Sequence, residues 1–395
     1  MFRAACVSLI FVFSTFALCQ NSDRQNPLAP QSSSAVQVVY VVDGSILTTY
    51  DIDPQTLYPT RVGTLTVPES TYPIINPSAD GHFLYYSAFN DASQSTHVLL
   101  VYATDATGAP QNPPVQRIDA NSLYGGVAID PKANFLYAIY AAPGAPYYTT
   151  YTIRRFVIDP NTGRISQSQA EATYSLPNGA EGTEYCGLII LGFNPAGTRL
   201  YDEVSCGYHG GASATYNERG VNLQTGALGP NAQVYSWSNS SGGGEYVQFV
   251  NGLLFDFVNP NSYEQGINSV DIYPVKPNTS TPIVQCTASM LQACGYAIGV
   301  AHPSGKYVFM GVSQDSTQID KVELSAHKIV DTTNYIPYQF GQFSPDGTLV
   351  YAISDASTYD IEIYGFDVAT GAARTNGGVI VLPSGLDVWF TAHRY

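Results

Sequence analysis

Two carboxylates and one imidazole stand out as groups that could do chemistry. Glu184-Tyr185 and Glu245-Tyr246 repeat one acidic and aromatic pair, and His209 lies between glycines in a loop predicted at 206–214. Two carboxylates facing one ligand could hold a divalent cation such as calcium, or act as acid and base, and histidine moves protons near neutral pH. Glu184, Glu245 and His209 are therefore the candidate catalytic residues. The alternative is that they are ordinary solvated loop residues, and the sequence names no metal.

Five tyrosines form a second candidate set, for ligand binding. Tyr124, Tyr296 and Tyr338 each lie seven residues before the proline of a repeated turn. Tyr185 and Tyr246 hold similar places. Aromatic rings at one height could stack on a sugar or an aromatic ligand. The alternative is that tyrosine is a common strand residue in a chain that has 30 of them.

The elements that position these residues are indicated by two repeated turns. The first places a short turn that starts at Pro, and in most copies contains Gly, between two apolar runs, a pattern typical of a β-hairpin. It occurs at Pro77–Tyr85, Pro131–Tyr137, Pro195–Tyr201, Pro303–Phe309 and Pro345–Tyr351. The second has the pattern Asp-x-x-Thr-Gly and follows the first at a similar distance, as at Asp159–Gly163, Asn222–Gly226 and Asp367–Gly371. Together they predict a four-stranded antiparallel unit.

The predicted fold class is all-β: a seven-bladed β-propeller of four-stranded antiparallel blades. Six blades are expected to begin near residues 73, 125, 187, 246, 296 and 339, and the seventh combines 38–67 with an apolar strand at 386–391. N- and C-terminal strands sharing one blade would close the ring and leave no free sheet edge. Both repeated turns then lie on one face, the turn face. The longer loops and all candidate residues lie on the opposite loop face, where binding residues usually occur.

On these turns the chain resembles the lactonase-type, 6-phosphogluconolactonase-like propellers, and it is also similar to surface-layer propeller repeats. The resemblance covers about residues 36–392. It implies a hydrolase that opens a sugar lactone, a carboxylic ester. Family enzymes carry a His-rich segment before one blade hairpin and a Gly-x-Asp segment after it. In this chain those places are taken by residues 186–193 and 200–206, and neither segment matches the family pattern. No catalytic residue of the family can therefore be placed on this chain.

The N-terminal residues are predicted to be an export signal. Met1–Arg3 gives a positive start, and Ala4–Leu18 is an apolar run too short to span a bilayer. Residues 1–19 are therefore expected to be a signal peptide, 20–35 a flexible segment and 36–395 a single propeller domain. The protein would be exported to the periplasm, the medium or the cell surface. Cys19 leaves a lipoprotein anchor as an alternative, and no later segment could span a membrane.

The four cysteines that follow the predicted signal peptide are expected to form two disulfides. Cys186 and Cys206 flank the turn at Pro195 symmetrically, so antiparallel pairing would bring them together as a disulfide. Cys286 and Cys294 bracket a short loop and are predicted to form a second one. Zinc is the alternative, but neither pair has Cys-x-x-Cys spacing.

The net charge of −15 without a basic patch argues against nucleic acid and anionic membranes as partners.

The predicted function is binding of a small ligand or a protein partner through the loop face, by a monomer that is lactonase-like by resemblance. A lactone-opening hydrolase is one alternative. A structural envelope or surface protein is the other.

Overall fold

The computed structural model describes residues 37–53, 55–68, 73–89, 97–120, 123–143, 147–166, 168–178, 184–208, 211–239, 244–259, 269–276, 281–287, 299–313, 316–337, 339–353, 360–374, 377–382 and 388–394. Within them, η3 (Leu324–Ala326) is a single helical turn and the other regular elements are strands. The predicted signal peptide, the predicted flexible segment and Cys19 lie outside the described residues. No helix of the described part is long and apolar enough to cross a membrane.

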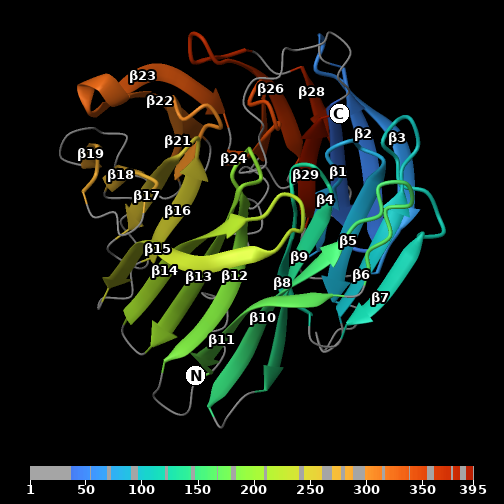
Figure 1. Ribbon diagram of the computed structural model, residues 1–395. Helices are drawn as coiled ribbons and strands as arrows, with labels where there is room; N and C mark the ends of the chain where they lie inside the picture. Colours follow the sequence, from blue (N-terminus) through green and yellow to red (C-terminus); the bar gives the residue numbers. More distant parts are fainter. Residues whose placement is uncertain are drawn as a thin grey trace, which may run out of the picture.

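Seven antiparallel sheets follow one another along the chain, and Figure 1 shows them arranged around a centre. Blade 1 contains β1 (Gln37–Asp43), β2 (Ile46–Ile52), β3 (Pro59–Thr66) and β29 (Val388–Arg394). Blade 2 contains β4 (Ile74–Pro77), β5 (Phe83–Phe89), β6 (His97–Ala103) and β7 (Gln116–Ala120). Blade 3 contains β8 (Leu123–Ile129), β9 (Phe135–Pro143), β10 (Tyr148–Val157) and β11 (Gln169–Pro177).

Three of the remaining four sheets repeat the same strand order, and the fourth has five strands. Blade 4 contains β12 (Tyr185–Phe193), β13 (Arg199–Tyr208), β14 (Gly211–Val221) and β15 (Leu228–Asn239). Blade 5 contains β16 (Gly244–Val250), β17 (Leu253–Asn259), β18 (Ser269–Pro274) and β19 (Val284–Thr287). Blade 6 contains β20 (Gly299–Ala301), β21 (Tyr307–Ser313), β22 (Ser316–Glu323) and β23 (Lys328–Pro337). Blade 7 contains β24 (Gln339–Phe343), β25 (Leu349–Ile353), β26 (Ile361–Asp367), β27 (Ala372–Ala373) and β28 (Gly378–Ile380). The predicted seven-bladed propeller is confirmed.

The core is divided into apolar clusters that lie between neighbouring blades. Among the described residues, seven such clusters join each blade to the next, and one of them joins blade 7 to blade 1 through residues such as Tyr351 and Val41. A strand packed on both faces must be apolar at consecutive positions. The run Val38–Val42 in β1 meets this need, because each of its residues is at most 2% exposed.

The two ends of the chain meet in blade 1. β29 pairs antiparallel with β1, from Gln37 opposite Arg394 to Asp43 opposite Val388. Strands from both ends therefore share one sheet. That this pairing closes the ring of blades stays a prediction.

The two repeated turns are joined by hydrogen bonds across the blade interfaces. The tyrosine after the first turn of one blade donates its hydroxyl to a carbonyl in the second turn of the next blade. Tyr85 donates to Gly163 at 3.0 Å, and Tyr137 donates to Gly226. This contact explains why the two turns keep the same phase along the sequence. These hydrogen bonds tie the turns of neighbouring blades to each other.

Gly226 shows how tightly the turn face is packed. Its φ is +71°, and a Cβ atom there would lie 2.6 Å from the Phe135 ring. We expect Gly226→Ala to lower the free energy of unfolding by about 2–4 kcal/mol, since backbone strain and overpacking add. Gly44→Ala is the control, because its φ is +58° but no atom lies within 4 Å. It should cost about 1 kcal/mol. Chemical denaturation of both variants measures the difference, and equal losses would contradict the packing argument.

Candidate functional site

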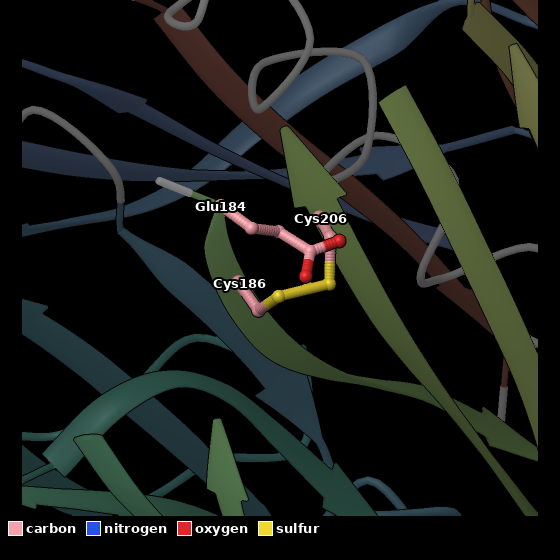
Figure 2. A group of neighbouring side chains, drawn as sticks. All are labelled: Glu184, Cys186 and Cys206. Carbon is pink, nitrogen blue, oxygen red and sulfur yellow. A yellow bond between two sulfur atoms is a disulfide. The ribbon is translucent and has the colours of Figure 1, made fainter. Parts of the chain in front are cut away.

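Glu184 lies at the loop-face edge of blade 4, directly before β12. It precedes Cys186, which lies opposite Cys206 of β13. The two sulfur atoms are bonded at 2.10 Å, so the predicted Cys186–Cys206 disulfide is confirmed. Figure 2 shows the Glu184 carboxylate pointing toward this bond, and its oxygen lies within 4.8 Å of both sulfur atoms. The covalent cross-link between β12 and β13 therefore fixes the strand end that carries Glu184.

This group does not form a metal site in the oxidised protein. Carboxylate and thiolate together can bind a metal, but only deprotonated sulfur is a ligand. In the disulfide, both sulfur atoms are already bonded to each other. Of this group of described residues one carboxylate alone remains, which is too few ligands for a calcium or zinc ion.

Tyr185, the residue after Glu184, supplies an exposed aromatic surface. It is the first residue of β12, and 46% of it is exposed. A large half-exposed ring on a cross-linked strand is held in place at little further entropic cost. Of the predicted site residues, Glu184 and Tyr185 are thus consecutive at the cross-linked end of β12.

The other predicted site residues lie partly or wholly outside the described residues. Tyr124 belongs to β8, and Glu245 and Tyr246 belong to β16, where they pair with Val258 and Phe257; none of these three side chains is described. His209, Tyr296 and Tyr338 lie outside the described residues. Their grouping with Glu184 and Tyr185 stays a prediction. The same holds for the second disulfide, since Cys294 also lies outside.

The loop predicted at 206–214 is much shorter than expected. Cys206 pairs with Ser213, Gly207 with Ala212 and Tyr208 with Gly211. The strands continue because backbone pairing satisfies polar groups that a long loop would leave to water. β13 therefore extends to Tyr208 and β14 begins at Gly211, within the range that was predicted to be a loop.

Glu203 is an ionisable residue that the sequence analysis missed. It lies in β13 between its cross-strand partners Ile189 and Tyr216, and only 2% of it is exposed. Its Oε2 atom has no hydrogen-bond partner among the described residues. Burial raises the pKa of its carboxyl to about 8, against a smaller lowering by the Ser205 hydroxyl. Glu203 is therefore a buried acid that keeps its proton near neutral pH.

The raised pKa of Glu203 predicts a pH-dependent stability. Below about pH 4.5 the carboxyl is protonated in both the folded and the unfolded chain. Between there and about pH 8 only the unfolded chain has lost its proton, so stability falls as the pH rises, by about 1.4 kcal/mol per pH unit. Glu203→Gln removes this slope. Urea denaturation across the range should therefore show the variant gaining stability over the wild type as the pH rises.

Glu323→Gln is the control for that experiment. Lys321, at 3.1 Å, holds the pKa of the Glu323 carboxyl below its ordinary value. Its contribution is present above the unfolded pKa and is lost as the pH falls. The variant should therefore be slightly less stable than the wild type at neutral pH, the opposite sign from Glu203→Gln. If Glu203→Gln shows no gain with rising pH, the carboxyl is not held protonated.

Asp202 precedes Glu203 in β13, so its side chain points to the other face of the sheet. It lies at the interface between blades 3 and 4. Its Oδ2 accepts from Arg219 Nε at 2.9 Å, and its Oδ1 accepts from the Tyr174 hydroxyl at 2.7 Å and from Asn217 at 3.0 Å. Arg219 also contacts the Tyr174 hydroxyl. Because Tyr174 comes from β11, this network fastens blade 3 to blade 4. Asp202 is thus a structural group rather than a site residue.

A cavity of about 560 Å³ lies on the turn face of blade 4. It is lined by residues 198–199, 220–222 and 227–229. Both repeated turns of blade 4 contribute to it, so it lies at the opposite end of the strands from Glu184. None of the predicted site residues lines it.

Comparison with known proteins finds the fold in solved structures. No family model matches the sequence, and no curated protein matches it. A candidate 6-phosphogluconolactonase from Bacteroides uniformis ATCC 8492 matches with a TM-score of 0.57 and 17% identity, over 90% of this chain and 99% of that one. The periplasmic gluconolactonase of Pseudomonas aeruginosa matches with a TM-score of 0.53 and 12% identity, over 91% and 99%. A candidate 6-phosphogluconolactonase from Bacteroides fragilis NCTC 9343 gives 0.53 and 15%, over 90% and 100%.

At such identities the likeness shows the fold alone. The predicted resemblance to lactonase-type propellers is confirmed at that level. The resemblance to surface-layer propellers stays a prediction.

Proposed function

We propose that this protein is exported and binds a small sugar-like ligand, such as a sugar lactone, through the loop face of blade 4. The observation that carries the proposal is the pair Glu184 and Tyr185 on the cross-linked end of β12. A carboxylate accepts hydrogen bonds from sugar hydroxyls, and an exposed ring stacks on the apolar face of the sugar. The disulfide holds both groups before the ligand arrives, which lowers the entropic cost of binding.

Export is proposed on three grounds. The N-terminal residues have the pattern of a signal peptide, with 20–35 as a flexible segment before the propeller domain at 36–395. A disulfide is stable in oxidising compartments. One structural neighbour is named as a periplasmic enzyme. The net charge of −15 supports a ligand other than nucleic acid, and we propose that the protein acts as a monomer.

Hydrolysis of the bound lactone is a second candidate function, and the names of three structural neighbours favour it. In that reaction water adds to the lactone carbonyl, the ring oxygen leaves as a hydroxyl and a hydroxy acid is formed. A base must take a proton from the water, and an acid must give one to the ring oxygen. Glu184, Glu245 and His209 would supply these roles, with or without calcium.

A binding titration tests the first proposal. Calorimetry with glucono-lactone and with gluconate should show binding by the wild type. Glu184→Gln and Tyr185→Ala should each weaken it about tenfold, since each removes one hydrogen-bonding or stacking contact. Tyr58→Ala is the matched control, because Tyr58 is 64% exposed but follows a turn of the opposite face. Equal affinities in all four proteins would contradict the proposal.

An activity assay separates binding from hydrolysis. Lactone opening is followed with and without calcium for the wild type, Glu184→Ala, Glu245→Ala and His209→Ala. A rate above the uncatalysed reaction that falls in these variants supports the hydrolase. Binding without any such rate supports a binding protein alone.

A further inference from the structure

Blades 3 and 4 are joined at the loop face by a row of backbone contacts. Asn178, directly after β11, forms an antiparallel bridge with Tyr185, the first residue of β12. The backbone N–H of Asn178 also donates to the carbonyl of Tyr147, directly before β10, at 2.9 Å. Tyr147, Asn178 and Tyr185 therefore lie in one row across three chain segments of two blades.

The row carries an exposed aromatic residue at each end. Tyr147 is 64% exposed and Tyr185 is 46% exposed, whereas Asn178 between them is partly buried. Paired segments are spaced about 4.8 Å apart, so the backbones of the two tyrosines are separated by about 10 Å. At that spacing the two rings offer separate stacking surfaces, and a ligand that uses both must be longer than one sugar ring.

Tyr147 has an unusual backbone conformation. Its φ is +70°, in the left-handed region that bulky residues rarely adopt. Such a conformation persists only where surrounding contacts hold it, and residues of this kind cluster at binding sites. The hydrogen bond from Asn178 is one such contact. A ring that is mostly exposed adds little to the core, so ligand binding is the better explanation for the strain at Tyr147.

The groups of the row favour a sugar chain over other classes of ligand. Aromatic rings stack on the apolar faces of sugars, and the amide of Asn178, on the same face as its partner Tyr185, can both donate to and accept from sugar hydroxyls. No lysine or arginine occurs at positions 147–149, 176–178 or 184–186, so the row has no cation for an anionic polymer. Among the described residues, no exposed aliphatic side chain belongs to the row, whereas protein partners usually bury an apolar patch.

We propose that the ligand of the loop face is an uncharged oligosaccharide that carries a lactone at its reducing end. The lactone unit binds at Glu184 and Tyr185, and the next sugar unit lies beside Asn178 and stacks on Tyr147. This inference rests on the proposed function and names its ligand class more narrowly. It also extends the site from blade 4 to blade 3, so that two blades share one ligand.

Calorimetry with glucono-lactone, cellobiono-lactone and maltobiono-lactone tests the proposal. The last two carry one more sugar on the same lactone through different linkages, so a poor fit of one linkage does not decide the result. The wild type should bind at least one of them about tenfold more tightly than glucono-lactone, because a second ring stacks. Equal affinity for all three ligands would overturn the proposal and leave the proposed function intact. Binding of none of them would overturn both.

Variants of Tyr147 separate the second sugar position from the first. Tyr147→Ala should lose the tenfold advantage of the longer ligand but bind glucono-lactone as the wild type does, and Tyr147→Phe, which keeps the ring, should keep the advantage. Tyr148→Ala is the matched control. Tyr148 is 42% exposed, but it lies opposite Pro177, on the other face of the strands from Asn178. Equal losses in Tyr147→Ala and Tyr148→Ala, or loss of glucono-lactone binding in Tyr147→Ala, would refute the second position.

Discussion

Replacing Arg219 by alanine is expected to lower the free energy of unfolding by about 3–5 kcal/mol. Among the described residues, the substitution removes the one cation that pairs with Asp202, whose side chain is 0% exposed. Tyr174 and Asn217 still donate hydrogen bonds to the carboxylate, but they carry no charge. A charge left buried without its counterion costs far more than the lost hydrogen bond itself. Equilibrium denaturation by urea measures the loss.

Arg117→Ala is the matched control. Arg117 pairs with Asp119 at 2.7 Å, a shorter distance than in the Arg219 pair, but the two side chains are 45% and 61% exposed. An exposed ion pair contributes less than about 1 kcal/mol, because water solvates both charges. A loss in Arg219→Ala no larger than in Arg117→Ala would show that the interface between blades 3 and 4 does not depend on this network.

Removing the Cys186–Cys206 disulfide is expected to cost about 3 kcal/mol, because the bond closes a loop of 20 residues in the unfolded chain. The double variant Cys186→Ala/Cys206→Ala makes the measurement by denaturation. The variant should also bind the sugar-like ligand more weakly, since the strand end that carries Glu184 and Tyr185 is no longer cross-linked. A variant as stable as the wild type would contradict the role of the bond.

Reductant provides the control for that experiment. It should destabilise the wild type to about the level of the double variant. If Cys286 and Cys294 form the second predicted disulfide, reductant should destabilise the double variant further. If they do not, adding reductant should leave the stability of the double variant unchanged.

The fold could be predicted because its repeated turns require particular residue types at fixed positions. The first turn places a residue at positive φ, a glycine at Gly197 and an alanine at Ala133, and the second needs a glycine beneath a ring of the preceding blade, as at Gly226. The tyrosine hydroxyl of Tyr137 then ties the two turns together. Each feature restricts the residue type locally, so the pattern survives in the sequence. The Cys186–Cys206 bond followed from pairing about one of these turns.

The buried acids could not be predicted from the same patterns. Asp202 and Glu203 are consecutive in β13, and both are buried because the strand packs on a blade at each face. Nothing local distinguishes them from surface acids. Their roles depend on residues far along the chain, such as Tyr174 for Asp202. The roles of Glu245 and His209 stay predictions, because the side chain of Glu245 and all of His209 lie outside the described part of the chain.

A crystal structure of the protein soaked with gluconate tests the central claim most directly, since it shows which face holds the ligand. We predict the ligand on the loop face of blade 4, stacked on Tyr185, with a hydroxyl within hydrogen-bond distance of the Glu184 carboxylate. The competing position is the cavity of about 560 Å³ on the turn face, beside Arg199 and Gly220. A ligand found there, or on the loop face without contact to Glu184 and Tyr185, would contradict the account.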